Sequence, residues 1–295
     1  MDNHSSFPIA DMYDHEILMH RDIHFGGSFD IMLKYYEDEG KGSNPEFEIS
    51  RIKVLQKTET INNVNLSEEL LDEDEQNIVK QAKQKYQILR DIYEDPNPGM
   101  AKLIADLILS EDIEAEEEID QLVKQGKKAT DALIEIISND DFFNPLYPGY
   151  GLTPIYAAKA LGLIKDERSI PILFETLSKS DFFTEETILE ALQEIGHPAQ
   201  DFLLKILKKE PFTKDNELAA TALLYMPMTE HLSEVFFEVL TNPKSQENHQ
   251  FTLYLVLGCE GLKKPNLRQS FKDLIEQLNN PEASVEAEFI IKSWK

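Results

Sequence analysis

The sequence PIYAAKALGLIKDERSIPIL, residues 154–173, decides the fold. Its Ala-Leu pair at 160–161 recurs at 191–192 and again at 222–223, so the chain repeats itself every 31 residues. A fixed period of about this length is the signature of stacked repeats, in which each helical unit buries its apolar face on its neighbours. The period therefore predicts an all-α protein, an α-α superhelix with a long exposed surface.

The same segment resembles a HEAT repeat, in particular the short variety first described in phycobilisome lyases. In that family an Ala-Leu-Gly-x-Ile helix end is followed by Asp-x-Arg and an Ile-Pro-x-Leu second helix, and the segment contains all three elements. The resemblance covers roughly residues 100–295 and is strongest over 153–207. It implies a HEAT-like solenoid in which Asp166 and Arg168 help to form a polar ladder between neighbouring repeats.

Helix-breaking residues divide the chain. The run Pro96-Asn97-Pro98-Gly99 is the clearest break, so we expect an N-terminal segment over 1–97 and a HEAT-like solenoid of about five units over 98–295. Residues 1 to about 24 show no clear period, which predicts an irregular arm. Beyond the arm, apolar residues at three- and four-residue steps predict a helix from about Asp72 to Tyr93.

Composition excludes several classes of partner. Asp and Glu outnumber Lys and Arg by 55 to 29, and the resulting net charge of −26 repels phosphate backbones and anionic lipid headgroups. We therefore predict no nucleic-acid binding and no membrane binding. The single Cys259 has no partner for an internal disulfide, and neither a signal peptide nor an apolar run of 18 residues is visible, so we expect a cytoplasmic protein.

Histidines gather in the expected arm. His15, His20 and His24 lie there among several carboxylates, and on a helix the four-residue step between His20 and His24 would place two imidazoles on one face. A third ligand could complete a zinc or iron site, although no His-Glu-x-x-His motif is present. We predict no metal site and no cofactor, and keep a metal-dependent role of this arm as the alternative.

The second helices of the repeats carry the first candidate binding surface. The residue two positions before the last apolar residue of each helix is expected to face outward, about 200° from the apolar stripe. The resemblance implies that second helices line the concave side of a solenoid. Four of the five residues in this column are acidic: Glu135, Glu175, Glu238 and Glu276, with Lys205 between them. The column predicts a site for a basic segment of a protein partner, although an acidic surface that only confers solubility explains it equally well.

An insertion forms the second candidate surface. Residues 139–151 lengthen one repeat by about ten residues, and insertions in repeat proteins often project from the binding face. Tyr147 and Tyr150 have rigid amphipathic rings suited to anchoring a partner.

The leading hypothesis is a non-enzymatic protein-protein interaction module or scaffold. The alternative is an enzyme, or a lyase-like accessory protein, that uses the His-rich N-terminal arm. Metal analysis and a His20→Ala/His24→Ala variant would separate the two hypotheses.

Overall fold

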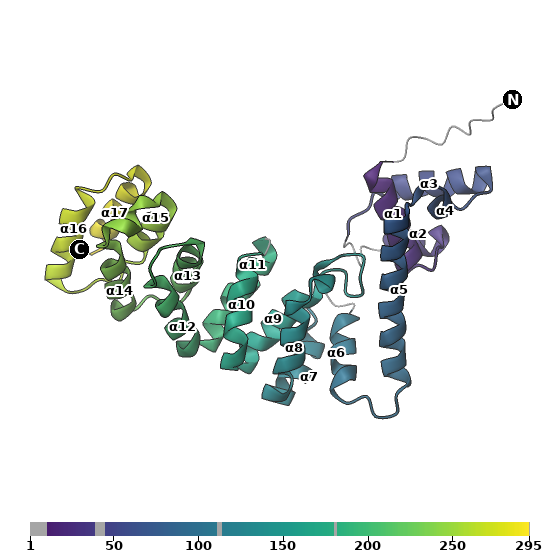
Figure 1. The fold of residues 1–295 in the computed structure, drawn as a ribbon, viewed down its shortest axis with the longest axis horizontal. Helices are drawn as coiled ribbons and strands as arrows, with labels where there is room; N and C mark the ends of the chain where they lie inside the picture. The colour runs from purple at the N-terminus through teal and green to yellow at the C-terminus, as the bar shows by residue number, and fades with distance from the viewer. Residues whose placement is uncertain (1–10, 39–44, 111–113, 180–181, 295) are drawn as a thin grey trace. The chain divides into compact units, whose positions relative to one another are not determined.

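The fold is all α-helical, as the repeat predicts. A computed structural model describes residues 11–38, 45–110, 114–179 and 182–294, and within these residues it contains helices α1 to α17, four short 3-10 helices and no strand (Figure 1). The chain forms two compact units: unit 1 is Met1–Gln125 with Glu135–Ala157, and unit 2 is Gly126–Ile134 with Ala158–Lys295. The expected boundary at residues 97/98 lies between two helices of unit 1 and stays a prediction.

Unit 1 contains seven complete α-helices among its described residues. They are α1 (Met12–His24), α2 (Phe29–Glu37), α3 (Ile49–Asn62), α4 (Leu66–Leu70), α5 (Glu73–Glu94), α6 (Met100–Ile108) and α7 (Glu116–Gln125). The long helix α5 packs on two others. Its N-terminal part contacts α1, and it also contacts the following helix, α6. Unit 1 also includes part of α8 (Thr130–Ser138), the 3-10 helix η2 (Asp140–Phe143) and the start of α9 (Thr153–Ile164).

The irregular arm expected over residues 1–24 is a helix from Met12 to His24. The described part begins at Asp11, whose side chain accepts a hydrogen bond from the backbone N–H of Asp14, while the Asp14 carboxylate accepts one from the N–H of Asp11. This capping box satisfies two N–H groups that a helix start otherwise leaves unpaired. Asp11 and Asp14, which interrupt the apolar pattern in the sequence, therefore form the start of this helix. Residues 1–10 of the expected arm lie outside the described residues.

The insertion after α8 joins the core of unit 1. Tyr147 belongs to the same buried cluster as Ile17 and Leu18 of α1 and Ile52 of α3, and Leu146 packs against it. Residues 144–151 thus cover helices that are distant in sequence, which ties this part of the repeat region to the N-terminal helices.

Unit 2 consists of helices in pairs. After α8 and α9 come α10 (Ile170–Leu177), α11 (Phe182–Ile195), α12 (His197–Leu207), α13 (Lys214–Tyr225), α14 (Glu230–Leu240), α15 (His249–Leu257), α16 (Pro265–Ile275) and α17 (Pro281–Ser293), with 3-10 helices η1 (Gly126–Lys128), η3 (Glu167–Ser169) and η4 (Pro243–Glu247). The first helices of successive pairs pack directly on one another, α11 on α13, α13 on α15 and α15 on α17. In the described chain, no comparably extensive packing joins second helices α10, α12, α14 and α16 to one another. The first helices therefore form the closer-packed layer.

Small residues permit this close approach. A methyl group built on Gly162 of α9 would lie 2.7 Å from the Cα and 3.0 Å from the Cβ of Ala191 on α11. The Ala-Leu pairs that define the repeat place buried alanines in this layer, because Ala160, Ala191 and Ala222 are all buried. The repeated alanine is therefore a packing requirement of the first helices.

Asparagines at an interval of 32 residues link the starts of the first helices. Asn280 caps α17 and donates from Nδ2 to the carbonyl of His249 (2.8 Å), while Asn248 caps α15 and donates to Oε1 of Glu217 on α13 (2.6 Å). The third member, Asn216, donates to the last carbonyls of α12, including Ile206 (2.7 Å). Asn248 and Asn280 thus each combine an N-cap with a hydrogen bond to the preceding first helix, whereas Asn216, the third residue of α13, accepts from the N–H of the N-cap Thr213 and bonds to the end of α12.

We predict that Gly162→Ala lowers the free energy of unfolding of unit 2 by about 1–3 kcal/mol. Alanine favours helices over glycine by about 1 kcal/mol, but here its methyl group must displace the α11 backbone. Urea unfolding followed by circular dichroism measures the change. The control is Gln193→Ala on the exposed side of α11, which should leave stability unchanged. A stabilised Gly162→Ala protein would show that the two helices separate easily.

Candidate functional site

The acidic column of the second helices is exposed. Glu175 lies on α10, Glu238 lies on α14, and Glu276 is the residue that ends α16; all three side chains are exposed within unit 2. Lys205 of α12 is exposed as well. Glu135 is exposed on α8, in the part of that helix that belongs to unit 1.

Lysines of the same unit already contact two of these carboxylates. Lys208 on α12 lies 2.8 Å from Oε2 of Glu238, and Lys179 lies 3.3 Å from Oε1 of Glu175. Pairs this exposed contribute only about 0–1 kcal/mol, because water and salt screen them. A cationic ligand that makes better contacts can therefore replace the lysines at little cost.

A second acidic group lies on the first helices, for which the sequence predicted no site. It consists of Glu186 and Glu190 of α11, beside Tyr225 of α13. Tyr225 at the end of α13 is 37% exposed, and desolvation together with Glu190 and Glu186 of α11 raises the pKa of its phenol. The signal for this group is the position of Tyr225 three residues after Ala222, the first residue of the Ala-Leu pair at 222–223. That position places it at the end of a first helix.

The two tyrosines of the insertion contact unit 1. Tyr147 is 7% exposed, and its hydroxyl donates to Oε1 of Gln81 on α5 (3.2 Å). The ring of Tyr150 is half-buried and stacks on His24, with 4.5 Å between the ring centroids. Tyr150 adopts φ 54° between two glycines that also have positive φ, a conformation that costs a non-glycine residue free energy. Both rings hold the insertion onto the N-terminal helices.

His20 and His24 lie in one aromatic cluster. They occupy one face of α1, as their spacing predicts for a helix, with 4.4 Å between ring centroids. His20 is fully buried and also contacts Phe25 and Phe47, whereas His15 lies apart and pairs with Glu75 of α5 (2.8 Å).

Burial keeps both rings neutral. Desolvation, reinforced by the neighbouring His24, lowers the pKa of His20 to about 2. Desolvation also lowers the pKa of His24 to about 4, although the nearby carbonyls of Pro145 and Leu146 offset part of this effect. Neither carbonyl has hydrogen-bond geometry to the buried Nε2 of His24.

Hydrogen bonds assign a tautomer to His20. The Tyr36 hydroxyl donates to the carbonyl of Pro45 (3.0 Å) and lies 3.1 Å from Nε2 of His20. Since its proton goes to the carbonyl, the hydroxyl accepts from Nε2–H, and Nδ1 is left as a buried acceptor without a partner. Within the described residues, no three His, Cys, Asp or Glu side chains come together in a metal-binding arrangement.

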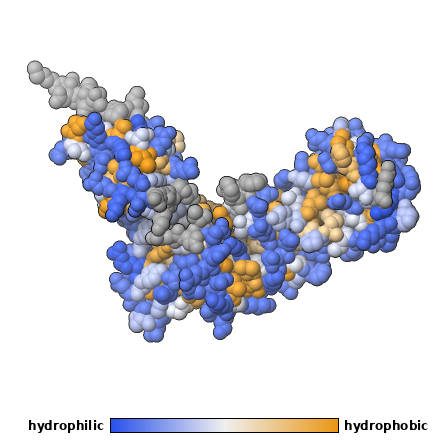
Figure 2. Space-filling view, turned by 180° about the vertical axis from the view of Figure 1, so that it is seen from behind, coloured by the Kyte–Doolittle hydropathy of each residue, from blue (hydrophilic) through white to orange (hydrophobic). Residues whose placement is uncertain are grey.

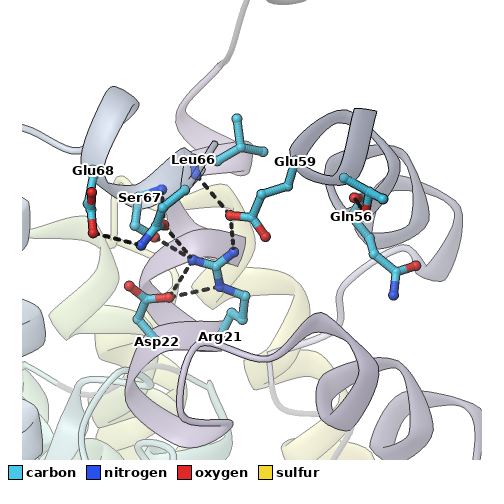
Figure 3. A network of polar contacts seen from close by, with 9 residues as sticks. Arg21, Asp22, Gln56, Glu59, Leu66, Ser67 and Glu68 are labelled. Carbon is cyan, nitrogen blue, oxygen red and sulfur yellow. Dashed lines mark hydrogen bonds and ion pairs between the residues drawn. The ribbon is translucent and has the colours of Figure 1, made fainter. Parts of the chain in front are cut away.

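A buried arginine connects three helices of unit 1 (Figure 3). The guanidinium of Arg21 on α1 donates to Oε1 of Glu59 on α3 (2.8 Å) and to Oγ of Ser67 on α4 (2.8 Å), and it also pairs with Asp22. Oε1 of Glu59 accepts a further bond from the backbone N–H of Leu66 (2.8 Å). This network leaves the buried cation fully paired, so its role is structural.

The pair expected to form a polar ladder joins two segments of unit 2. Arg168 donates to Oδ1 of Asp131 (2.6 Å) and to Oδ2 of Asp166 (2.7 Å), and buried Asp166 also accepts from the hydroxyl of Thr130 (3.0 Å). Hydrogen bonds from Arg168 and the other donors lower the pKa of Asp166 to about 2. The next unit has His197 and Pro198 instead of such a pair.

A family model of HEAT repeats matches residues 152–224. The matched residues run from the start of α9 almost to the end of α13, which is the region of the 31-residue period. This match supports HEAT repeats in that part of the chain, while the phycobilisome-lyase type stays a prediction. No curated protein matches the chain. In the described residues, no helix has the length and apolar character needed to cross a membrane.

We predict that Arg21→Ala lowers the free energy of unfolding by about 3–5 kcal/mol, because it leaves Glu59 partly buried without its cation. Chemical unfolding followed by circular dichroism measures the loss. Arg21→Lys retains the charge without the fork of donors and should lose less. The control, Arg90→Ala on the exposed side of α5, should have no effect. A loss below about 1 kcal/mol for Arg21→Ala would contradict the structural role.

We predict that unit 1 loses stability as the pH falls from 6.5 to 4. Unfolded histidines take up protons below about pH 6.5, whereas folded His24 stays neutral to about pH 4 and His20 to lower pH. The unfolded state binds more protons in this window, so each histidine removes up to about 1.4 kcal/mol per pH unit. Urea unfolding at several pH values measures the slope.

A double variant isolates the two histidines from the carboxylates that also titrate. His20→Phe/His24→Phe keeps two rings but no titrating nitrogen, and should flatten the slope between pH 6.5 and 5. His231→Gln, which changes an exposed histidine, should leave it unchanged. An equal slope in wild type and double variant would show that the two rings are accessible to protons in the folded state.

Proposed function

We propose that unit 2 is a protein-interaction module that binds a basic segment of a partner protein along its second helices. HEAT repeats are commonly protein-interaction scaffolds. The observation that carries the proposal is the exposure of three carboxylates near the ends of second helices: Glu175 and Glu238, each two residues before the last residue of its helix, and Glu276, directly after α16. The net charge of the chain adds long-range attraction for a cationic partner.

Spacing and charge define the segment that such a surface accepts. The carboxylates lie on or at the ends of separate helices, so an extended chain with lysine or arginine at intervals suits this surface better than a single cation. Lys205 and Lys208 on α12 interrupt the acidic column, which favours a segment with a gap in its own positive charge. Attraction of this kind raises the association rate more than the final affinity and weakens with salt.

The alternative, an enzyme or accessory protein that acts through the His-rich region, has less support. His20 is fully buried and His24 half-buried, and both rings are held neutral within the aromatic cluster of unit 1. Tyr147 and Tyr150, expected to anchor a partner, pack on unit 1 and are left out of the proposed surface.

We predict that Glu175→Lys/Glu238→Lys/Glu276→Lys weakens binding of a fluorescent Lys- and Arg-rich peptide by at least about tenfold. Loss of three favourable contacts, each worth some tenths of a kcal/mol, and repulsion from three new cations act in the same direction. Fluorescence anisotropy at two salt concentrations measures the affinity and its salt dependence, which should also fall.

The control changes the net charge by the same amount elsewhere. Glu69→Lys/Glu94→Lys/Asp120→Lys alters three exposed carboxylates of unit 1 and should weaken binding much less. If the two triple variants bind equally well, the peptide responds to net charge alone and the column is not a binding surface.

A further inference from the structure

The last helix presents an exposed stripe that no part of the described chain covers. On α17 the buried residues Ala283, Ala287 and Ile290 face α15 and α16. At 100° per residue, a stripe of four exposed residues lies on the opposite side of the helix. From N- to C-terminus they are Glu282, Val285, Phe289 and Lys292.

The centre of this stripe is apolar. Val285 is 54% exposed and Phe289 is 61% exposed, and the two lie one turn apart. Figure 2 shows hydrophobic surface beside hydrophilic surface over the C-terminal helices of unit 2. Adjacent large apolar side chains on a soluble protein indicate a contact surface more often than isolated ones do.

Contacts at both ends hold α17 rigid. Asn280 caps the helix and is bonded to the start of α15 through the carbonyl of His249. After the helix, Trp294 packs edge-on against Phe271, and its Nε1–H donates to the carbonyl of Glu260 (2.8 Å). A stripe on an element fixed in this way loses little entropy when it docks.

The stripe is complementary to itself. In an antiparallel pair of α17 helices related by a two-fold axis at the level of Ala287, position 285 of one helix meets position 289 of the other. The same axis brings position 282 against position 292. Each Val285 then packs on a Phe289, and each Glu282 lies beside a Lys292 of opposite charge. A parallel arrangement would instead place like charges together.

We propose that a second copy of this chain docks on α17 and forms an isologous antiparallel dimer. Lys292 is already near Glu288 (3.6 Å) and over the Phe289 ring (5.5 Å), but these contacts are exposed and weak, so the lysine can turn to Glu282 of the other copy. One helix from each chain makes a small interface, and the two chains repel each other through their net charge of −26. The dimer is therefore weak, and salt that screens the net charge favours it.

Sedimentation equilibrium of the full chain, from micromolar to about 1 mM and in about 0.15 M salt, tests the dimer. Phe289→Ser should raise the dissociation constant roughly 100-fold or more, because it removes one large apolar side chain from each copy at the interface. Leu163→Ser removes another exposed apolar residue of unit 2, on α9, and should change nothing. A wild-type chain that stays monomeric over this range overturns the proposal.

A charge exchange tests the pairing itself. E282K and K292E alone should each weaken the dimer by several-fold, whereas E282K/K292E together should restore the wild-type constant within about threefold, because each pair is re-formed with reversed signs. Circular dichroism of every variant checks that α17 still folds. Failure of the double variant to recover, or assembly beyond a dimer, would instead indicate a head-to-tail contact and overturn the antiparallel pairing.

Discussion

The close packing of the first helices is the constraint on which unit 2 depends. Neighbouring first helices touch because buried alanines and Gly162 leave room for the backbones to approach. That approach brings the starts of the helices near enough for asparagine side chains to bond from one repeat to the next. The second helices pack less on one another, and their charged residues are directed to solvent. The buried alanines and Gly162 thus determine how closely the first helices of unit 2 pack.

Unit 1 is stabilised by different means. Its helices vary in length and have no repeat, so no regular layer forms, and buried polar groups determine how they meet. Arg21 joins α1 to α3 and α4 through charged hydrogen bonds, and the histidine-tyrosine cluster fixes the insertion against α1 and α5. Such groups are costly to bury unless all their hydrogen bonds are formed. They therefore favour one arrangement of the helices over others. Nδ1 of His20, Nε2 of His24 and Oγ1 of Thr153, which are buried without a partner in the described part of unit 1, are the exceptions.

Local signals predicted most helices, and long-range contacts account for what they missed. Asp72 begins α5 through its side chain, and the Pro96 to Gly99 break separates α5 from α6, both as the sequence indicates. The helix from Met12 was missed because its start is polar and its apolar residues are interrupted by histidines. The position of the insertion could not be predicted, since Tyr150 meets His24 more than a hundred residues away. The exposure of the acidic column follows from helical periodicity, but a single sequence carries no record of what binds there.

The chain has a single indole, and it directly follows the last helix, α17. Trp294 lies beside Phe271 and beneath the guanidinium of Arg268, whose carbon is 4.9 Å from the ring centroid. Because no other tryptophan competes, ultraviolet emission from this residue is an intrinsic optical reporter of that one region. Fraying of the C-terminal repeat will therefore be visible as a red shift even while the rest of the array keeps its helices. The molecule thus allows local melting to be distinguished from global melting without any added label.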